Sequence, residues 1–132
     1  MLNKLPRVGK ILALDIGRRN TGVAITDATQ KAVFLREAFS HKSQIELVER
    51  LRVFFADESV VGVLAGWPLD MSGAKTEETL LVEEVIEKIR ALDVPVAVMD
   101  ERWTSKQAEK NQGSHSEAAL ILLNTYLDSL LP

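Results

Sequence analysis

The sequence predicts a single α/β domain, spanning residues 1–132, that is built on a mixed sheet. In the first forty residues, short runs of β-branched and aliphatic residues are separated by tight connections, which is typical of an antiparallel meander. Two later apolar runs alternate with helical patterns, and this order is typical of parallel strands joined by helical crossovers. A chain of 132 residues is also long enough to bury one core without covalent staples.

The meander is expected in the N-terminal third of the chain. Its first strand is the apolar run at 11–14, and a tight turn containing Gly17 leads into the second strand at 22–26. The third strand, at 32–39, carries β-branched and aromatic residues. Short connections of this kind place the three strands side by side and antiparallel.

Helices and strands alternate in the rest of the chain. Ser43 and Glu46 form a capping-box pattern at the start of the first helix. Short apolar runs at 60–65 and 94–99 have the character of buried parallel strands, and a long amphipathic helix separates them. A last helix is expected at 115–130.

Composition excludes several classes of site. The chain has no cysteine, so disulfides, zinc–thiolate sites and thiol nucleophiles are excluded. No apolar run approaches the roughly 20 residues of a membrane span, and the N-terminus lacks the apolar core of a secretory signal. We therefore expect a cytoplasmic protein without a membrane partner. The net charge of −3 argues against a protein that coats nucleic acid generically.

The first strand and its turn carry the strongest chemical signal. Asp15 follows an apolar strand, and a carboxylate there is costly unless it is paired or holds a metal. Gly17 lets the backbone turn, and Arg18 and Arg19 place positive charge beside the acid. This combination is typical of a metal-assisted site that handles phosphate groups.

Two further groups are expected at the same end of the sheet as Asp15. Glu101 follows the last strand, where ligands gather in open α/β sheets. One of the two acids Asp100 and Glu101 could simply pair with Arg102. We favour Glu101 as the site residue, because Asp100 shares the face of the strand's valines. His115 begins the last helix and is expected to continue its inward stripe rather than to point to solvent.

Two carboxylates and an imidazole suit a hard divalent ion, Mg²⁺ or Mn²⁺. Two such ions about 4 Å apart would activate a water and stabilise the leaving oxygen in phosphodiester hydrolysis. Simpler interpretations stay open for single residues. Asp15 could only hydrogen-bond its own turn, and His115 could be a surface cap. His41 is expected to be an exposed loop histidine, and Trp67 and Trp103 to be core residues rather than base-stacking platforms.

Four segments together resemble the YqgF/RuvX family of Holliday-junction-resolvase-like nucleases: LALDIGRRNTGVAITD, LAGWPLDMSG, VMDERWTSKQAE and EAALILLNTYLD. The resemblance spans about residues 10–128. It implies an RNase H-like fold, in which an antiparallel meander of three strands and two parallel strands form a five-stranded mixed sheet flanked by helices. It further implies a metal-dependent nuclease acting on structured nucleic acid, in 5′-end processing of pre-16S rRNA or in resolution of branched DNA.

The resemblance also suggests residue roles. Asp15 and Glu101 match the family's catalytic and metal-binding acids, and His115 stands where the family usually has an aspartate. The residues expected to form the loops of the site are Gly17, Gly66, Pro68 and Gly73. The expected nucleic-acid contacts are Arg18, Arg19, Arg102 and Lys106.

Departures from the family pattern leave other functions open. Besides His115, Trp67 replaces a usual aliphatic residue, and the segment 103–114 is shorter and less basic than is usual. A second interpretation is therefore a nucleic-acid-binding or ribosome-assembly module with little cleavage activity. A third, an actin-like or sugar-kinase-like ATPase, uses a similar D-x-G turn but by resemblance needs two such domains. RNA or DNA as substrate, and monomer or homodimer, also stay open.

Overall fold

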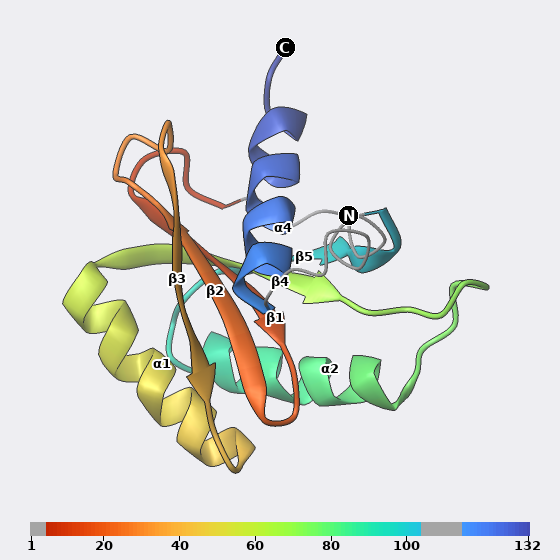
Figure 1. Cartoon of the computed structure of the whole chain (residues 1–132). Helices are drawn as coiled ribbons and strands as arrows, with labels where there is room; N and C mark the ends of the chain where they lie inside the picture. The colour runs from red at the N-terminus through yellow and green to blue at the C-terminus, as the bar shows by residue number, and fades with distance from the viewer. Residues whose placement is uncertain (1–4, 104–114) are drawn as a thin grey trace.

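The computed structural model describes residues 5–103 and 115–132, and its centre is a five-stranded mixed sheet with strand order β3-β2-β1-β4-β5 (Figure 1). The first three strands form the predicted antiparallel meander, and β4 and β5 run parallel to β1. The strands are β1 (Lys10–Ile16), β2 (Asn20–Thr26), β3 (Val33–Ser40), β4 (Val60–Trp67) and β5 (Val96–Asp100). The predicted α/β class and strand pattern are confirmed.

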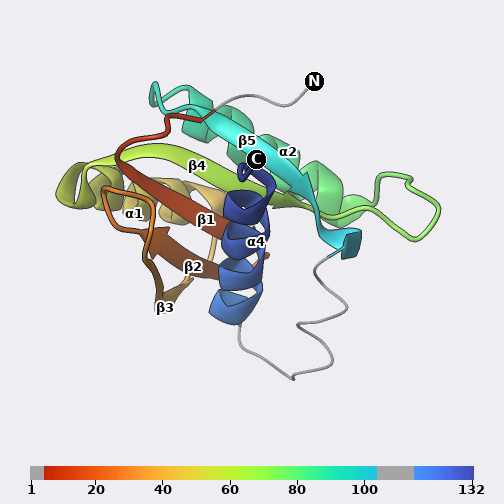
Figure 2. The same cartoon turned by 90° about the horizontal axis from the view of Figure 1, so that it is seen from above.

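Helices cover both faces of the sheet. The helices α1 (Gln44–Glu58) and α2 (Glu77–Arg90) lie on one face, and α4 (His115–Ser129) lies on the other (Figures 1 and 2). None of the described helices is long and apolar enough to cross a bilayer. Because β4 and β5 run parallel to β1, the carboxyl ends of these three strands meet at one edge of the sheet. The first turn of α4 lies next to this edge, where His115 is 3.9 Å from Asp15.

Two hydrophobic cores explain why the central strands read as continuous apolar runs. In β1, Leu12 and Leu14 pack toward α1 and α2, whereas Ile11 and Ala13 pack toward α4. A strand covered on both faces has no solvent side, so its sequence does not alternate. On the α4 face several core residues are alanines, and these small side chains bring the helix close to the sheet.

The predicted capping box of α1 is only half formed. Ser43 is the N-cap, and its side chain accepts a hydrogen bond from the N–H of Glu46. The carboxylate of Glu46, however, accepts from the N–H of Lys42 at 3.3 Å and not from that of Ser43. The helix start is as predicted, but the return bond reaches one residue further back.

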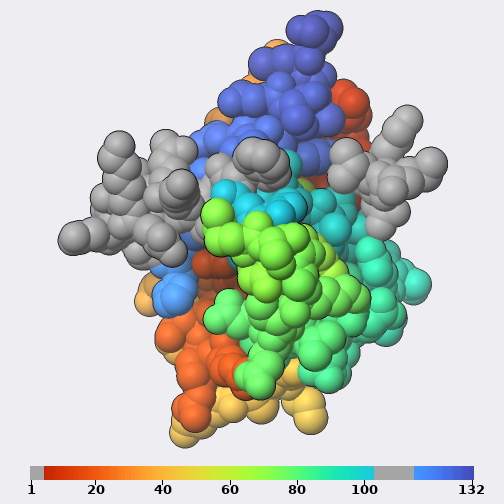
Figure 3. Space-filling view, turned by 90° about the vertical axis from the view of Figure 1, so that its right-hand side faces the viewer, coloured from red at the N-terminus to blue at the C-terminus, as the bar shows by residue number. Residues whose placement is uncertain are grey.

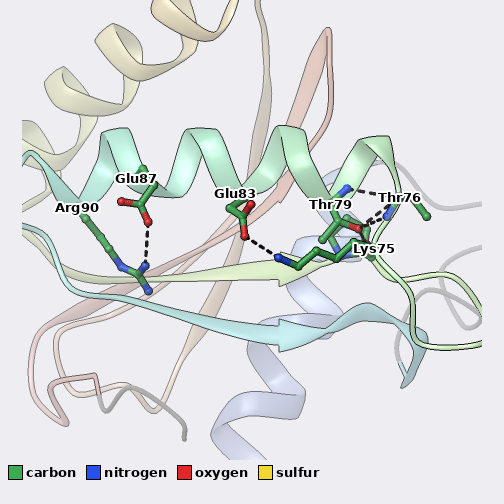
Figure 4. A network of polar contacts seen from close by, with 7 residues as sticks. Lys75, Thr76, Thr79, Glu83, Glu87 and Arg90 are labelled. Carbon is green, nitrogen blue, oxygen red and sulfur yellow. Dashed lines mark hydrogen bonds and ion pairs between the residues drawn. The ribbon is translucent and has the colours of Figure 1, made fainter.

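A reciprocal threonine cap ties α2 to the loop before it. The N–H of Thr79 donates to the hydroxyl of Thr76, and the N–H of Thr76 donates to the hydroxyl of Thr79 at 2.9 Å (Figure 4). The Thr79 hydroxyl also donates to the carbonyl of Pro68. Lys75 pairs with Glu83 at 3.0 Å on the solvent side (Figure 4). The loop after β4 is thus anchored by the helix that follows it.

His41 is buried, which overturns the expectation of an exposed loop histidine. Only 5 % of the surface of His41 is exposed, and its Nε2 lies 2.9 Å from the hydroxyl of Thr21. The reason is that β3 carries His41 back beside the start of β2, where the chain turns into α1. Trp67 packs against the core that faces α1 and α2, in agreement with its core assignment.

Candidate active site

Asp15 and Glu101 form a hydrogen-bonded pair of carboxyl groups at the edge where the parallel strands end. Asp15 is near the end of β1, and Glu101 opens the short helix η1 (Glu101–Trp103) directly after β5. The strand β4 lies between β1 and β5. A Cβ on Gly66 of β4 would overlap the carboxyl of Glu101, so the glycine leaves the space through which Glu101 reaches Asp15.

The surroundings of Glu101 favour its protonated form. Burial, then the hydrogen bond and the charge of Asp15, raise the pKa of Glu101 to about 9, and Glu78 and Asp100 add further negative charge. Two carboxylates this close cannot both ionise cheaply. Glu101 therefore keeps its proton near neutral pH, and a divalent cation bound between the two carboxyl groups would take the place of that proton.

His115 lies beside this pair but faces solvent more than predicted. Its Nδ1 is 3.9 Å from Oδ2 of Asp15, and its side chain is 57 % exposed. The buried stripe of α4 passes through Ser116, Ala119 and Leu123, three and then four residues apart. The expectation that His115 continues the inward stripe is wrong, because the stripe steps back from Ala119 to Ser116 and leaves His115 at its margin.

Gly22 and Ser116 hold the start of α4 against β2, and sequence reasoning identified neither. A Cβ on Gly22 would overlap the carbonyl group of His115. The register of β2 with β3 shifts between Thr21 and Val23, and the N–H of Val23 donates to the hydroxyl of Ser116 at 3.0 Å. A glycine inside a strand pattern often marks such a close backbone approach, and this signal could have found Gly22.

The donor set fits a hard divalent cation in part. Asp15 contacts both Glu101 and His115, and two oxygen ligands that share a proton are suited to Mg²⁺ or Mn²⁺. Within residues 5–103 and 115–132, however, no group of three or more histidine and acidic side chains is close enough to hold one ion. The structure thus brings the three predicted ligands to one place without closing them around a common point.

The arginines among the predicted nucleic-acid contacts differ in whether an acidic side chain pairs with them. Arg18 is exposed and lies 3.4 Å from the carboxylate of Glu77. Arg102 is committed to Asp100, with two guanidinium hydrogen bonds of 2.7 and 2.9 Å that lower the pKa of Asp100. Arg19 is exposed and forms no ion pair with a residue that the structure describes. Lys106 lies outside the described residues.

Of the predicted loop residues, Pro68 lines a pocket in the loop after β4. Gly73 has a positive φ of 91° and lies against the guanidinium of Arg102, which links this loop to the end of β5. Figure 3 shows the loop after β4 in green, next to the cyan end of β5. A pocket of about 520 Å³ opens here. Its lining residues are Arg18, Pro68, Leu69, Thr76, Glu77 and Glu78.

The remaining loop residue, Gly17, lies in the turn between β1 and β2. A Cβ on Gly17 would be 2.6 Å from the carbonyl oxygen of Asn20. The turn that follows Asp15 is therefore closed tightly enough to exclude a side chain at this position.

Two solved structures share this fold. The chain titled T. thermophilus RuvC in complex with Holliday junction substrate matches with a TM-score of 0.64 at 12 % identity, over 92 % of this chain and 95 % of that one. The large terminase nuclease from thermophilic phage G20c matches with a TM-score of 0.52 at 15 % identity, over 92 % of this chain and 58 % of that one. The likeness to RuvC confirms the predicted RNase H-like fold.

Sequence relatives are similar over nearly their whole length. A Dictyoglomus thermophilum protein named "Putative pre-16S rRNA nuclease" is 30 % identical over 133 residues, which cover 91 % of this chain and 96 % of the relative. Its namesake from Dictyoglomus turgidum is 29 % identical over 134 residues, covering 92 % and 95 %. The family model described as "RuvX: Holliday junction resolvase" matches residues 9–129, which include all the strands and the site. The chain therefore belongs to the RuvX family.

Proposed function

We propose that the protein is a metal-dependent nuclease that hydrolyses phosphodiester bonds in structured nucleic acid, with Asp15, Glu101 and His115 as its catalytic and metal-binding residues. The observation that carries the proposal is the hydrogen-bonded pair of carboxyl groups, Asp15 and Glu101, at the carboxyl ends of the parallel strands. Membership of the RuvX family and the nuclease names of its relatives support the same reaction class.

Each side chain has a distinct part in this proposal. When bound, Mg²⁺ or Mn²⁺ supplies Lewis acidity and lowers the pKa of a coordinated water. Asp15 and Glu101 would hold the cation, and the carboxyl of Glu101 would have to lose its proton to serve as a ligand. His115 stands 3.9 Å from Asp15 and would be the third ligand. Gly66 keeps the space above β4 free of a side chain.

The preferred substrate is pre-16S rRNA, because the relatives carry that substrate in their names. The family resemblance implies that the cut lies at the 5′ end of this RNA. Branched DNA is the second candidate, since the family is described as a Holliday junction resolvase. With an rRNA substrate, we expect the protein to act in the cytoplasm. A homodimer remains a prediction, which light scattering of the purified protein in solution tests.

A module that binds nucleic acid without cutting it is the second candidate function. Two observations favour it: His115 is more than half exposed, and the described residues contain no cluster of three metal-ligating side chains. In this alternative the fold and the carboxyl pair are retained, and the chain acts in ribosome assembly by binding alone.

The deciding experiment compares cleavage of a pre-16S leader RNA and a four-way DNA junction in Mg²⁺, Mn²⁺ and EDTA. We expect metal-dependent cleavage by the native chain and none by Asp15→Asn. Asp93→Asn is the matched control, because Asp93 lies before β5, away from the site, and its positive φ of 63° suits asparagine. Binding without metal-dependent cleavage of either substrate would favour the assembly module. Hydrolysis of ATP without nucleic acid would favour the ATPase.

A further inference from the structure

A second polar pocket lies on the same edge of the sheet as the carboxyl pair. We name it the β3–α1 pocket; it has a volume of about 320 Å³ and lies between the β1–β2 turn and the start of α1. Its lining residues are Arg19, Asn20, Ser40, His41, Lys42 and Glu46. Because Arg19 follows Asp15 in the same tight hairpin, the pocket is next to the candidate active site.

Hydrogen bonds between distant parts of the chain give this pocket a defined shape. The N–H of His41 donates to the carbonyl of Arg19 at 2.9 Å, and its buried ring meets Thr21. The hydroxyl of Ser40 donates to the side-chain oxygen of Asn20 at 3.1 Å. The β1–β2 turn and the end of β3 are thereby tied together, so the cations they carry are held near one another.

Three cations without carboxylate partners gather at this corner. Arg19 and Lys42 are exposed, and neither forms an ion pair within the described part of the chain. Arg50 donates to the carbonyl of Ser40 at 2.6 Å and stacks over the ring of Phe39 with its charge unpaired by any described acid. Most other described lysines and arginines are paired with a carboxylate.

The pocket keeps a net positive charge despite one acid in its lining. Glu46 is that acid, and its carboxylate accepts the N–H of Lys42. Burial lowers the pKa of His41, an effect that Glu46 opposes and Arg50 assists, so its ring is neutral near pH 7. Arg19 and Lys42 then exceed the charge of Glu46, and the α1 N-terminus adds a positive partial charge.

We infer that the β3–α1 pocket binds a backbone phosphate of the nucleic acid, away from the bond that is cut. Arg19 and Lys42 would contact the phosphate oxygens, with Asn20 as a hydrogen-bond donor beside them. The nature of the ligand rests on the proposed function. Contacts of this kind in the β3–α1 pocket would position the nucleic acid without reading its sequence.

The first test measures binding against salt concentration in the non-cleaving Asp15→Asn background. The double substitution Arg19→Ala/Lys42→Ala should weaken binding of leader RNA and four-way DNA junction alike, several-fold. It should also reduce the slope of log K against log salt by about 1, the value for one lost phosphate contact. Lys31→Ala is the matched control, since Lys31 is an exposed lysine in the β2–β3 turn, at the other end of the sheet.

Removing the one acid of the pocket gives a test in the opposite direction. Glu46→Gln keeps the length of the side chain and its ability to accept the Lys42 N–H. We expect it to tighten binding and leave the start of α1 intact, as checked by circular dichroism. An unchanged affinity and slope in both Glu46→Gln and the double variant would overturn the inference.

The two histidines of the chain separate this inference from the proposed function. His41 lines the β3–α1 pocket, and His115 lies beside Asp15. Inorganic phosphate, and then a short non-hydrolysable oligonucleotide, should shift the ring resonances of His41 in NMR spectra, and the Arg19→Ala/Lys42→Ala variant should lose the shift. A response at His115 with none at His41 would overturn the pocket inference and leave the proposed function standing.

Discussion

Asp15 lies opposite Gly22 in the β1–β2 pair, and the backbone of His115 rests where a side chain on Gly22 would stand. Gly22, which pairs with Asp15, is thus also the residue against which the start of α4 packs. The 3.9 Å between His115 and Asp15 is therefore set by β2 as much as by α4. This arrangement gives two predictions about residues that touch neither metal nor substrate.

Gly22→Ala should displace the start of α4. The added methyl group would overlap the carbonyl of His115, which is backbone and cannot rotate away. Overpacking a core of this kind costs about 1–3 kcal/mol of unfolding free energy, and His115 should move away from Asp15. Urea denaturation measures the first effect, and a loss of nuclease activity measures the second.

Gly62→Ala is the control for Gly22→Ala. Gly62 lies in β4, and the nearest neighbours of an added Cβ are the ends of the Ile11 and Leu5 side chains, both at 3.2 Å, which can adjust. Equal losses of stability and activity in the two variants would show that the contact with His115 has no special role.

Ser116→Ala should destabilise the protein by leaving a buried donor unpaired. Ser116 is 5 % exposed, and its hydroxyl accepts the N–H of Val23. Loss of that partner costs about 1–3 kcal/mol. The control is Ser129→Ala, at the other end of α4, where the hydroxyl bonds an exposed carbonyl. Similar denaturation midpoints for the two variants would contradict a positioning role for Ser116.

The raised pKa of Glu101 should make the metal-free protein less stable as the pH rises. Between the ordinary value of 4.5 and the folded value of about 9, the folded carboxyl keeps a proton that the unfolded chain has lost. The unfolding free energy therefore falls with pH, by up to about 1.4 kcal/mol per pH unit. The extra stability is fully present below pH 4.5 and is lost as the pH approaches about 9.

Glu101→Gln tests this dependence in EDTA, because an amide does not titrate. Its denaturation midpoint should vary less with pH than that of the native chain, and it should exceed the native midpoint on the alkaline side. Glu37→Gln, an exposed change on β3, should leave the pH dependence as it is. A native chain whose stability is flat across this pH range would refute the shared proton.

His115→Asp should change the preference of the site between cations. Replacing an imidazole by a carboxylate removes the nitrogen that favours Mn²⁺, so the ratio of Mg²⁺ to Mn²⁺ affinity should rise several-fold. The exposed start of a helix accepts aspartate readily, and the variant should fold. Calorimetric titration with each ion measures the ratio. An unchanged ratio would show that His115 is not a ligand.

Local patterns predicted most of the fold and the positions of two candidate site residues. The alternation of apolar runs and helical stripes predicted every described strand and the helices α1, α2 and α4, but not the short helix η1. These periods depend only on neighbouring residues. The positions of Asp15 and Glu101 at strand ends followed from the same pattern, since parallel strands bring their carboxyl ends together.

Three features could not be read from local patterns. The burial of His41 depends on β3 returning beside the start of β2. The sequence suggested that Arg102 pairs with one of the two acids beside it, and the turn after β5 decides that this acid is Asp100. The orientation of α4 depends on whether Ser116 or His115 continues the buried stripe before Ala119. These residues lie three and four positions before Ala119, and both spacings are compatible with one face of a helix.

The sequence by itself determined that an acid would stand at the end of the first strand, with a second acid after the last strand and a histidine at the last helix. Only the tertiary structure decided how these groups meet. Gly66 lets Glu101 cross β4 to share a proton with Asp15, and Gly22 lets α4 approach β2 while His115 stays at the solvent margin. Both outcomes depend on space between residues far apart in the chain, and that space exists only when the sheet is assembled.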